Sequence, residues 1–476
     1  MNTTKRDQNY AIGFADELSQ FLTESLIVAG KVPDWLNGTL IKNGPAKFHA
    51  GQIELAHWFD GFAKLHKFDI ASGQIQYSCR FIESQAYHNA CVNGKLGQYE
   101  FASNPEFGLF DRLKAIVSPP LTDNTNVNLI PGEDRWLALT ETSKVIGFSP
   151  ETLDTLGPFN FKDKITAQFS TAHPVLDPNT GAILNLHIEI SLGVHYLISY
   201  WQQEGSASKR KILARIPVKQ PAYMHSFAQT ARYLIIVESP LRLRSLDLVL
   251  GKKPYLDCYE WHEGMGTRFL VIDKSDGSYF VCDYADRFYF HQVNGFEVDN
   301  VLVLDVLTYP DATVLNEFRL INLKAGRAIQ IPRLERFHID LKTKKVEANH
   351  IGSCAIELAR INHLRTNCIP HRYVWGAGAT SNISFLDQVV KLDVQSGSHS
   401  TWARPGCYYG EPLFVARPDG QLEDDGVLLC IELDSIKQCS KLVIIDATSM
   451  QLLAEATTPN IVPFGFHAVF APRRIN

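Results

Sequence analysis

A short polar turn recurs along this chain between apolar segments. Most of these turns open with aspartate, and several close with glycine; they lie at residues 69–73, 149–152, 177–181, 273–277, 340–343, 393–397 and 446–449. Aspartate and glycine tolerate the backbone angles that tight β-hairpin turns require. The recurrence therefore predicts a chain built mainly of β-hairpins.

The segments between the turns support this interpretation. They are short runs of β-branched and aromatic residues, such as 233–237 and 442–445, which are typical of strands. Asp340, Asp393 and Asp446 lie 53 residues apart, near the repeat length of propeller blades. Seven hairpin signatures predict an all-β fold, a seven-bladed β-propeller. The earlier turns are unevenly spaced, which weakens the evidence for a repeat. The alternative is therefore a generic β-rich domain.

The sequence shows little other organisation. An amphipathic helix is expected over residues 15–25, ahead of a turn at 33–38. No linker rich in proline, glycine or serine and no block of charge divides the chain. We therefore expect a single domain over residues 1–476, with residues 1–29 as an N-terminal extension that carries the short helix.

Composition excludes several classes of protein. With 45% apolar and 20% charged residues, wholesale disorder is excluded. The net charge of −5 argues against nucleic-acid binding, which needs basic surfaces. The sequence contains no run of about 18 apolar residues, so a membrane-spanning helix is not expected. The first nine residues lack the apolar core of a signal peptide. The nine cysteines include no CxxC pair, which favours reduced thiols and a cytoplasmic location.

Four of the sixteen histidines are flanked by aromatic or apolar residues. They are His173 in Thr-Ala-His-Pro, His225 in Tyr-Met-His-Ser-Phe, His291 in Tyr-Phe-His-Gln-Val and His467 in Gly-Phe-His-Ala. Burial of such rings without partners would cost several kcal/mol. Separate blades could each supply one histidine near the propeller axis, where a shared metal would satisfy all four.

These contexts resemble the four metal-histidine motifs of the carotenoid cleavage oxygenases, and they occur in the order of that family. Further matches are Pro-Asp-Trp-Leu-Asn-Gly-Thr-Leu at 33–40, His-Trp-Phe-Asp-Gly at 57–61, Glu-Pro-Leu-Phe-Val at 411–415 and Glu-Asp-Asp-Gly at 423–426. The resemblance extends over residues 30 to 472 and includes features of the animal-type members.

The resemblance implies one Fe(II) per chain, held by His173, His225, His291 and His467 beneath a capping region of loops and short helices. It also implies that Glu141, Glu357 and Glu411 accept the free N–H groups of ligand histidines, which fixes their tautomers. One departure is Ala359, where the family usually has proline before Arg-Ile-Asn.

The activity implied is oxidative cleavage by O2 of a double bond in a carotenoid or apocarotenoid, giving two carbonyl products. The animal-type motifs favour central 15,15′ cleavage to retinal. A retinyl ester isomerohydrolase and a stilbene-cleaving oxygenase are alternatives on the same fold. Outside enzymes, the alternative is a propeller scaffold that binds protein partners.

An apolar segment at 107–121 contains Phe107, Leu109, Phe110 and Leu113, with Arg and Lys interleaved. The resemblance places this segment at the mouth of a substrate tunnel, where it dips into a membrane surface and admits a lipid-borne substrate. We therefore expect peripheral membrane association. The alternative is a buried core helix. Asn-Pro-Glu at 104–106 replaces the animal-type cysteine motif, so palmitoylation is not expected there.

Overall fold

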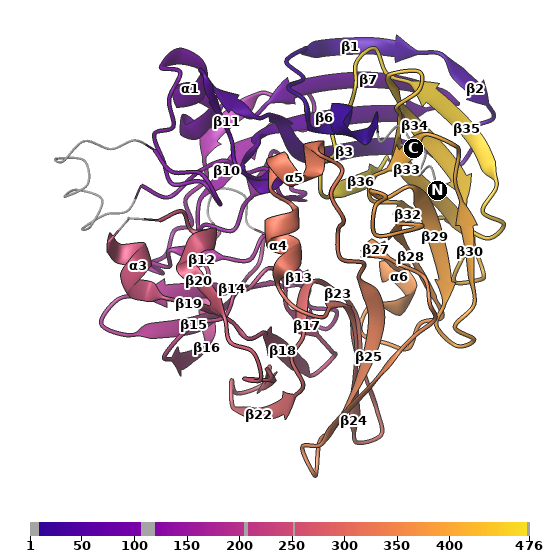
Figure 1. Cartoon of the computed structure of the whole chain (residues 1–476). Coiled ribbons are helices and arrows are strands. Elements are labelled where there is room, and N and C mark those ends of the chain that lie inside the picture. The colour runs from indigo at the N-terminus through magenta and orange to yellow at the C-terminus, as the bar shows by residue number, and fades with distance from the viewer. Residues whose placement is uncertain (1–8, 106–119, 204–207, 251–252, 474–476) are drawn as a thin grey trace, which may run out of the picture.

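Seven antiparallel sheets follow one another around a ring in the part of the chain that the structure describes (Figure 1). This computed structural model describes residues 9–105, 120–203, 208–250 and 253–473. The sheets are the blades of a β-propeller, and we number them 1 to 7 in chain order. The predicted all-β, seven-bladed fold is confirmed.

The first three blades contain the following strands. Blade 1 contains β1 (Phe21–Leu26), β7 (Gln74–Phe81), β6 (Phe62–Ala71), β3 (Gly38–Lys47) and β36 (Ala468–Pro472). Blade 2 contains β11 (Thr155–Pro158), β10 (Val145–Phe148), β9 (Trp136–Leu139) and β8 (Asn128–Ile130). Blade 3 contains β12 (Phe169–Ser170), β13 (Val175–Leu176), β14 (Ile183–Ile190), β15 (Val194–Trp201) and β16 (Lys211–Val218).

The remaining blades are built in the same way. Blade 4 contains β17 (Ala228–Gln229), β18 (Tyr233–Glu238), β21 (Thr267–Asp273) and β22 (Tyr279–Tyr284). Blade 5 contains β23 (Phe288–Val298), β24 (Val301–Tyr309), β25 (Arg333–Asp340) and β26 (Val346–His350). Blade 6 contains β27 (Glu357–Arg360), β28 (Tyr373–Gly378), β29 (Gln388–Asp393) and β30 (His399–Trp402). Blade 7 contains β2 (Val28–Gly30), β35 (Leu452–Thr457), β34 (Cys439–Asp446), β33 (Gly426–Asp434), β31 (Cys407–Tyr409) and β32 (Leu413–Ala416).

The seven predicted polar turns all lie between strands, one turn in each blade. Aspartate side chains hold them: Asp273 Oδ1 accepts from the Ser275 backbone at 2.9 Å, and Asp446 Oδ1 accepts from the Ser449 backbone at 2.7 Å. The regular interval of 53 residues marks equivalent hairpins of blades 5, 6 and 7. The chemistry of the turns therefore sets the strand boundaries.

The two ends of the chain meet in blade 1, where β3 pairs with β36. This pairing joins segments more than 400 residues apart, from Thr39 opposite Ala471 to Lys42 opposite Ala468. The last blade is completed similarly, because β2 pairs with β35. These pairings are the basis of our proposal that residues 1–476 form one domain.

Central strands are buried on both faces, which explains their continuous apolar sequences. In β18, Ile235 and Val237 pack between blades 4 and 5, whereas Leu234 and Ile236 belong to a larger core that extends to the axis. Side chains of a strand alternate between its two faces, and each propeller blade has a neighbour on either side. The sequences of strands such as 233–237 are therefore continuously apolar.

The predicted helix at residues 15–25 is wrong. A 3-10 helix, η1 (Asn9–Phe14), lies earlier, and residues 21–26 form β1, an edge strand paired with β7. Leu18 and Leu22, which belonged to the supposed apolar helical face, are 56% and 74% exposed. A short isolated helix is marginal in water, whereas the edge of blade 1 offers a pairing partner to the residues from Phe21 onward.

Short elements connect the blades and cover one end of the axis. The helical elements are η1, η2 (Trp58–Asp60), α1 (Gln85–Val92), α3 (Ser245–Leu250), η4 (Leu256–Cys258), α4 (Thr313–Glu317), α5 (Leu320–Lys324) and α6 (His363–Thr366). Two small hairpins accompany them, β4 (His49–Ala50) with β5 (Ile53–Glu54) and β19 (Leu241–Leu243) with β20 (Tyr259–Trp261). Figure 1 draws α4 and α5 near the middle of the ring. None of the helices in the described ranges is long and apolar enough to span a membrane.

Candidate metal centre

Each blade contributes one of seven side chains that surround the propeller axis. Blades 3, 4, 5 and 1 provide His173, His225, His291 and His467, in chain order. Blades 2, 6 and 7 provide Glu141, Glu357 and Glu411. The structure thus brings together all seven residues singled out from the sequence.

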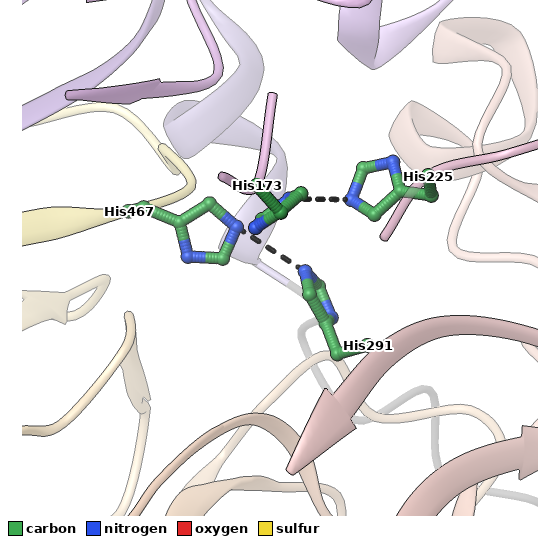
Figure 2. A group of neighbouring side chains, drawn as sticks. All are labelled: His173, His225, His291 and His467. Atoms are coloured by element: carbon green, nitrogen blue, oxygen red, sulfur yellow. Dashed lines mark hydrogen bonds between the residues drawn. The ribbon is translucent and has the colours of Figure 1, made fainter. Parts of the chain in front are cut away.

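The four histidine rings converge on one point (Figure 2). Each offers a ring nitrogen within 4.8 Å of the nitrogens of the other three. The closest pairs are His173 Nε2 and His225 Nε2 at 3.1 Å, and His291 Nε2 and His467 Nε2 at 3.2 Å. His225 and His467 are buried, at 5% and 4% exposed, whereas His173 and His291 are partly buried.

Three of the histidines point their other ring nitrogen at a carboxylate. His225 Nδ1 lies 2.6 Å from Glu141 Oε1, and His291 Nδ1 lies 2.6 Å from Glu357 Oε2. His467 Nδ1 lies 2.8 Å from Glu411 Oε1. His173 has no such carboxylate within the described part of the chain.

The titration of these groups follows from burial and from the pairing. Burial lowers the pKa of His225 despite the opposing influence of Glu141, and it lowers the pKa of His467 to about 4. Burial by itself would raise the pKa of Glu357, but His291 outweighs it and the pKa falls below its usual value. Arg360 and His467 likewise outweigh burial at Glu411, whose pKa lies well below its usual range. At His467 and Glu411, a neutral imidazole therefore faces an ionised carboxylate.

This pairing fixes the tautomer of each paired histidine. The Nδ1 atom carries the hydrogen that is donated to the glutamate, so Nε2 keeps a lone pair. The Nε2 atoms of His291 and His467 face each other at 3.2 Å, and in the tautomers that the glutamates select neither of them carries a hydrogen. Two such nitrogens repel each other, whereas a cation between them would attract both.

The donor set fits a transition metal. With a metal–nitrogen bond of about 2.1 Å, two ligands at a right angle stand about 3 Å apart, as the two closest pairs do. Imidazole suits Zn, Cu, Fe and Ni alike, so the nitrogens alone do not select the metal. Four nitrogens leave further positions of an octahedron open.

A large apolar cavity adjoins the cluster. It encloses about 1200 Å³, including its open mouth, and His225, His291 and His467 form part of its wall. Most of the remaining wall is aromatic or aliphatic, with Phe59 and Phe290 beside the histidines. Such an apolar wall suits an apolar ligand next to the four nitrogens.

Sequence reasoning missed the residues that hold the glutamates. The Tyr223 hydroxyl donates to Glu141 Oε1 at 2.6 Å, and Arg360 Nε donates to Glu411 Oε1 at 2.8 Å. Both lie inside motifs that were recognised. Tyr223 is two residues before His225, and Arg360 is three after Glu357. The two-residue period of extended chain was the signal that could have identified Tyr223.

The backbone is also distorted at one glutamate. Leu358 has a φ of +50°, a conformation that side-chain-bearing residues rarely adopt. Its N–H donates to Glu357 Oε2 at 2.5 Å, and the register of β27 shifts between Glu357 and Arg360. This strained turn aims Glu357 at His291, although Ala359 replaces the proline expected there.

The predicted entry residues Phe107, Leu109, Phe110 and Leu113 lie outside the described residues. Leu121, at the end of the same segment, is described and lines the cavity. The expectation that residues 107–121 meet a membrane therefore stays a prediction.

Known proteins resemble this chain over nearly its whole length. Residues 14–472 match the family model described as retinal pigment epithelial membrane protein. A carotenoid isomerooxygenase of Galleria mellonella is 31% identical, and the match covers 94% of this chain and 93% of the relative. The human beta,beta-carotene 15,15′-dioxygenase is 28% identical, with 93% of this chain and 91% of the relative covered.

Solved structures agree with these relatives. A Synechocystis apocarotenoid oxygenase superposes with a TM-score of 0.87 and 26% identity, over 98% of this chain and 99% of that one. A cobalt-substituted form of that oxygenase matches equally well, which indicates a metal centre in that protein. The match over residues 14–472, together with the propeller and its four converging histidines, shows that this chain belongs to the retinal pigment epithelial membrane protein family, that of the carotenoid oxygenases.

Proposed function

We propose that this protein is a non-haem Fe(II) dioxygenase that cleaves a carbon–carbon double bond of a carotenoid or apocarotenoid with O2, giving two carbonyl products. His173, His225, His291 and His467 would hold one iron per chain. Glu141, Glu357 and Glu411 would orient three of these ligands and offset the charge of the ion.

One observation carries the proposal. The four histidine nitrogens converge beside an apolar cavity, with His291 Nε2 only 3.2 Å from His467 Nε2. Such an arrangement is costly without a cation. A cobalt-substituted neighbour supports a metal centre, and relatives named for carotenoid cleavage support a polyene as the substrate.

The residues of the chain would act mainly by positioning. Bound iron would supply the activation of O2, which the protein side chains lack. Phe59 and Phe290 would hold the polyene against the histidines by apolar contact, and their rings would exclude water. The tautomers fixed by the glutamates would keep the four nitrogens aimed at one point.

Central 15,15′ cleavage to retinal is the reaction we propose first, because a 28% identical human relative is named for it. The name of the Galleria relative favours a second candidate, cleavage coupled to isomerisation of the polyene. The two reactions differ in the geometry of their products, so separation of the cis and trans products distinguishes them.

We also propose that the protein is cytoplasmic and binds membranes peripherally through residues 107–121. A carotenoid dissolves in lipid, so a substrate of this class would need an entry from a membrane surface. The cavity wall includes Leu121, at the end of that segment, which supports an entry on this side.

Metal and product analysis of the purified protein tests the proposal. The expected result is about one iron per chain and, with β-carotene in the presence of O2, carbonyl products that carry oxygen from O2. Retinyl ester serves as the competing substrate, because its turnover to a retinol without O2 would indicate an isomerohydrolase. Protein free of metal and inactive on every polyene would instead favour a propeller scaffold.

A further inference from the structure

Glu100 is a buried carboxyl group in the cavity wall that the metal centre does not use. It is 2% exposed and lies between Tyr99 and Phe101, which line the same cavity. Its backbone is fixed on both sides: Glu100 N donates to Ser103 O at 3.0 Å, and Tyr99 pairs with Leu121 in a parallel bridge. Glu100 therefore occupies a defined place in the wall.

The described residues offer Glu100 no cation and leave one of its oxygens without a hydrogen bond. Glu100 Oε1 is buried and has no partner. The other two carboxylates of the wall, Glu141 and Glu357, are bound to His225 and His291. Glu141 Oε2 is likewise buried without a hydrogen bond, but Glu141 has His225 as its partner and Glu100 has no histidine. The neighbouring Asp60 is satisfied, since it accepts from Ala102 N at 2.8 Å and from Ser103 Oγ at 2.7 Å.

Its surroundings favour the protonated form of Glu100. Burial, together with the nearby Asp60 and Asp123 carboxylates, raises the pKa of Glu100 well above its usual range, although Thr122 and Asn124 oppose the shift. A protonated carboxyl group both donates and accepts a hydrogen bond. It is therefore suited to an uncharged oxygen-containing group on a ligand, and a buried group left unpaired is costly.

We propose that the Glu100 carboxyl group hydrogen-bonds an oxygen-containing end group of the substrate, a hydroxyl or a carbonyl. The cavity would then select polyenes with a polar terminus over pure hydrocarbons. This inference rests on the proposed function in one respect, namely that the cavity holds a polyene. It adds the class of polyene and the residue that recognises it.

The position of Glu100 relative to the histidines also bears on where the substrate is cut. The ring of Phe101 lies 5.2 Å from that of Phe59, which in turn lies 6.3 Å from that of His225. A polyene anchored at Glu100 would run along these rings towards the four nitrogens. The anchor would set how far along the chain the reacting double bond lies.

Equilibrium binding without O2 tests the proposal, because it excludes turnover. Three polyenes of equal conjugated length are used: a hydrocarbon, its ring-hydroxylated analogue and an aldehyde-terminated analogue. Quenching of tryptophan fluorescence reports binding to the protein as purified, to Glu100→Leu and to Glu100→Gln. Glu133→Leu, at an exposed position, is the control.

The unmodified protein should bind at least one oxygenated polyene roughly 10-fold to 100-fold more tightly than the hydrocarbon. Glu100→Leu should abolish this preference, and Glu100→Gln, which still donates and accepts, should keep most of it. If Glu100→Leu does not fold, Glu100→Ala takes its place. Equal binding of all three polyenes by the unmodified protein, or an unchanged preference in the Leu or Ala variant, would overturn the proposal.

The experiments distinguish a failure of the Glu100 proposal from a failure of the proposed dioxygenase function. A preference for oxygenated polyenes in a protein that cleaves none of them with O2 would contradict the dioxygenase and leave the role of Glu100 intact. Cleavage of a hydrocarbon carotenoid as efficiently as of both its hydroxylated and its aldehyde-terminated analogues would contradict the role of Glu100 and leave the dioxygenase intact.

Discussion

Glu411 binds the ring of His467 and also the backbone of the residue that follows it. His467 Nδ1 lies 2.8 Å from Glu411 Oε1, and the next backbone N–H, that of Ala468, donates to Glu411 Oε2 at 2.8 Å. Ala468 begins β36, the strand that pairs with β3 and closes blade 1. One carboxylate therefore orients a histidine of the cluster and fixes the start of the strand on which ring closure depends.

Removal of one histidine should empty the metal centre. His225→Ala leaves three nitrogens and a cavity beside Glu141, so iron content should fall from about one per chain to nearly none. Elemental analysis of the purified variant provides the measurement, and circular dichroism checks the fold. His350→Ala, on the exposed strand β26, is the matched control and should keep its iron. Full iron occupancy in His225→Ala would refute the assignment.

Each glutamate should contribute to metal affinity and activity through the histidine that it binds. Glu141→Gln, Glu357→Gln and Glu411→Gln keep the side-chain volume but remove the charge, and each should weaken metal affinity or activity by roughly 10-fold to 100-fold. Competition with a chelator measures the affinity. Glu133→Gln, on the exposed turn before β9, is the control. Three variants with full iron and full turnover would contradict the role of the glutamates.

Tyr223→Phe tests how much the hydroxyl that binds Glu141 contributes to metal affinity, apart from the Glu141 carboxylate itself. The variant removes only the hydroxyl that donates to Glu141 Oε1 at 2.6 Å. The carboxylate still accepts from His225, so metal affinity should fall less than in Glu141→Gln. The same chelator competition compares the two variants, and an equal or larger loss in Tyr223→Phe would contradict this order.

Acid should release the metal, and Arg360 should set the pH at which this happens. The pKa of Glu411 is depressed in the folded protein, with Arg360 and His467 outweighing burial. A carboxyl of this kind stabilises the centre while it is ionised, and that contribution is lost as the pH falls through its folded pKa. Arg360→Met removes the cation and raises this pKa, so metal loss should begin at a higher pH.

Metal content after equilibration at a series of decreasing pH values measures the effect of Arg360→Met. Arg372→Met, which removes an exposed arginine paired with Asp393, is the control and should leave the profile unchanged. Coincident profiles for the unmodified protein and Arg360→Met would show that Arg360 does not tune the centre.

The segment at 107–121 should bind membranes. Changing Leu109, Phe110 and Leu113 to Ser together should remove several kcal/mol of membrane affinity, at about 25 cal/mol per Å² of apolar area. Liposome sedimentation measures the affinity, and activity on detergent-dispersed substrate should suffer less than activity on liposomes. Iron content should not change, because the histidines lie on other segments.

Leu364→Ser combined with Ile436→Ser is the control for surface hydrophobicity, since both side chains are exposed, at 88% and 71%. That variant should bind liposomes as the unmodified protein does. Failure of the triple variant to fold, rather than loss of membrane binding, would favour a buried core helix at 107–121.

The sequence alone was sufficient for the features that local chemistry controls. Turns such as 340–343 and 393–397 are recognisable because aspartate binds its own turn backbone, as Asp340 does with Thr343 N at 2.7 Å. The seven histidines and glutamates were identifiable because each lies in a motif that resembles one family. A motif preserves the chemistry of a site even where its members lie hundreds of residues apart.

Tertiary structure decided the features that depend on contacts between distant segments. Residues 15–25 were expected to be helical from their own pattern, but β7 offered β1 a sheet edge, and those hydrogen bonds prevailed. The bond from Arg360 to Glu411 and the unpaired oxygen of Glu100 were equally invisible in the sequence. Local pattern reports the preference of a segment, whereas burial and pairing are set by the rest of the molecule, which only the folded chain brings together.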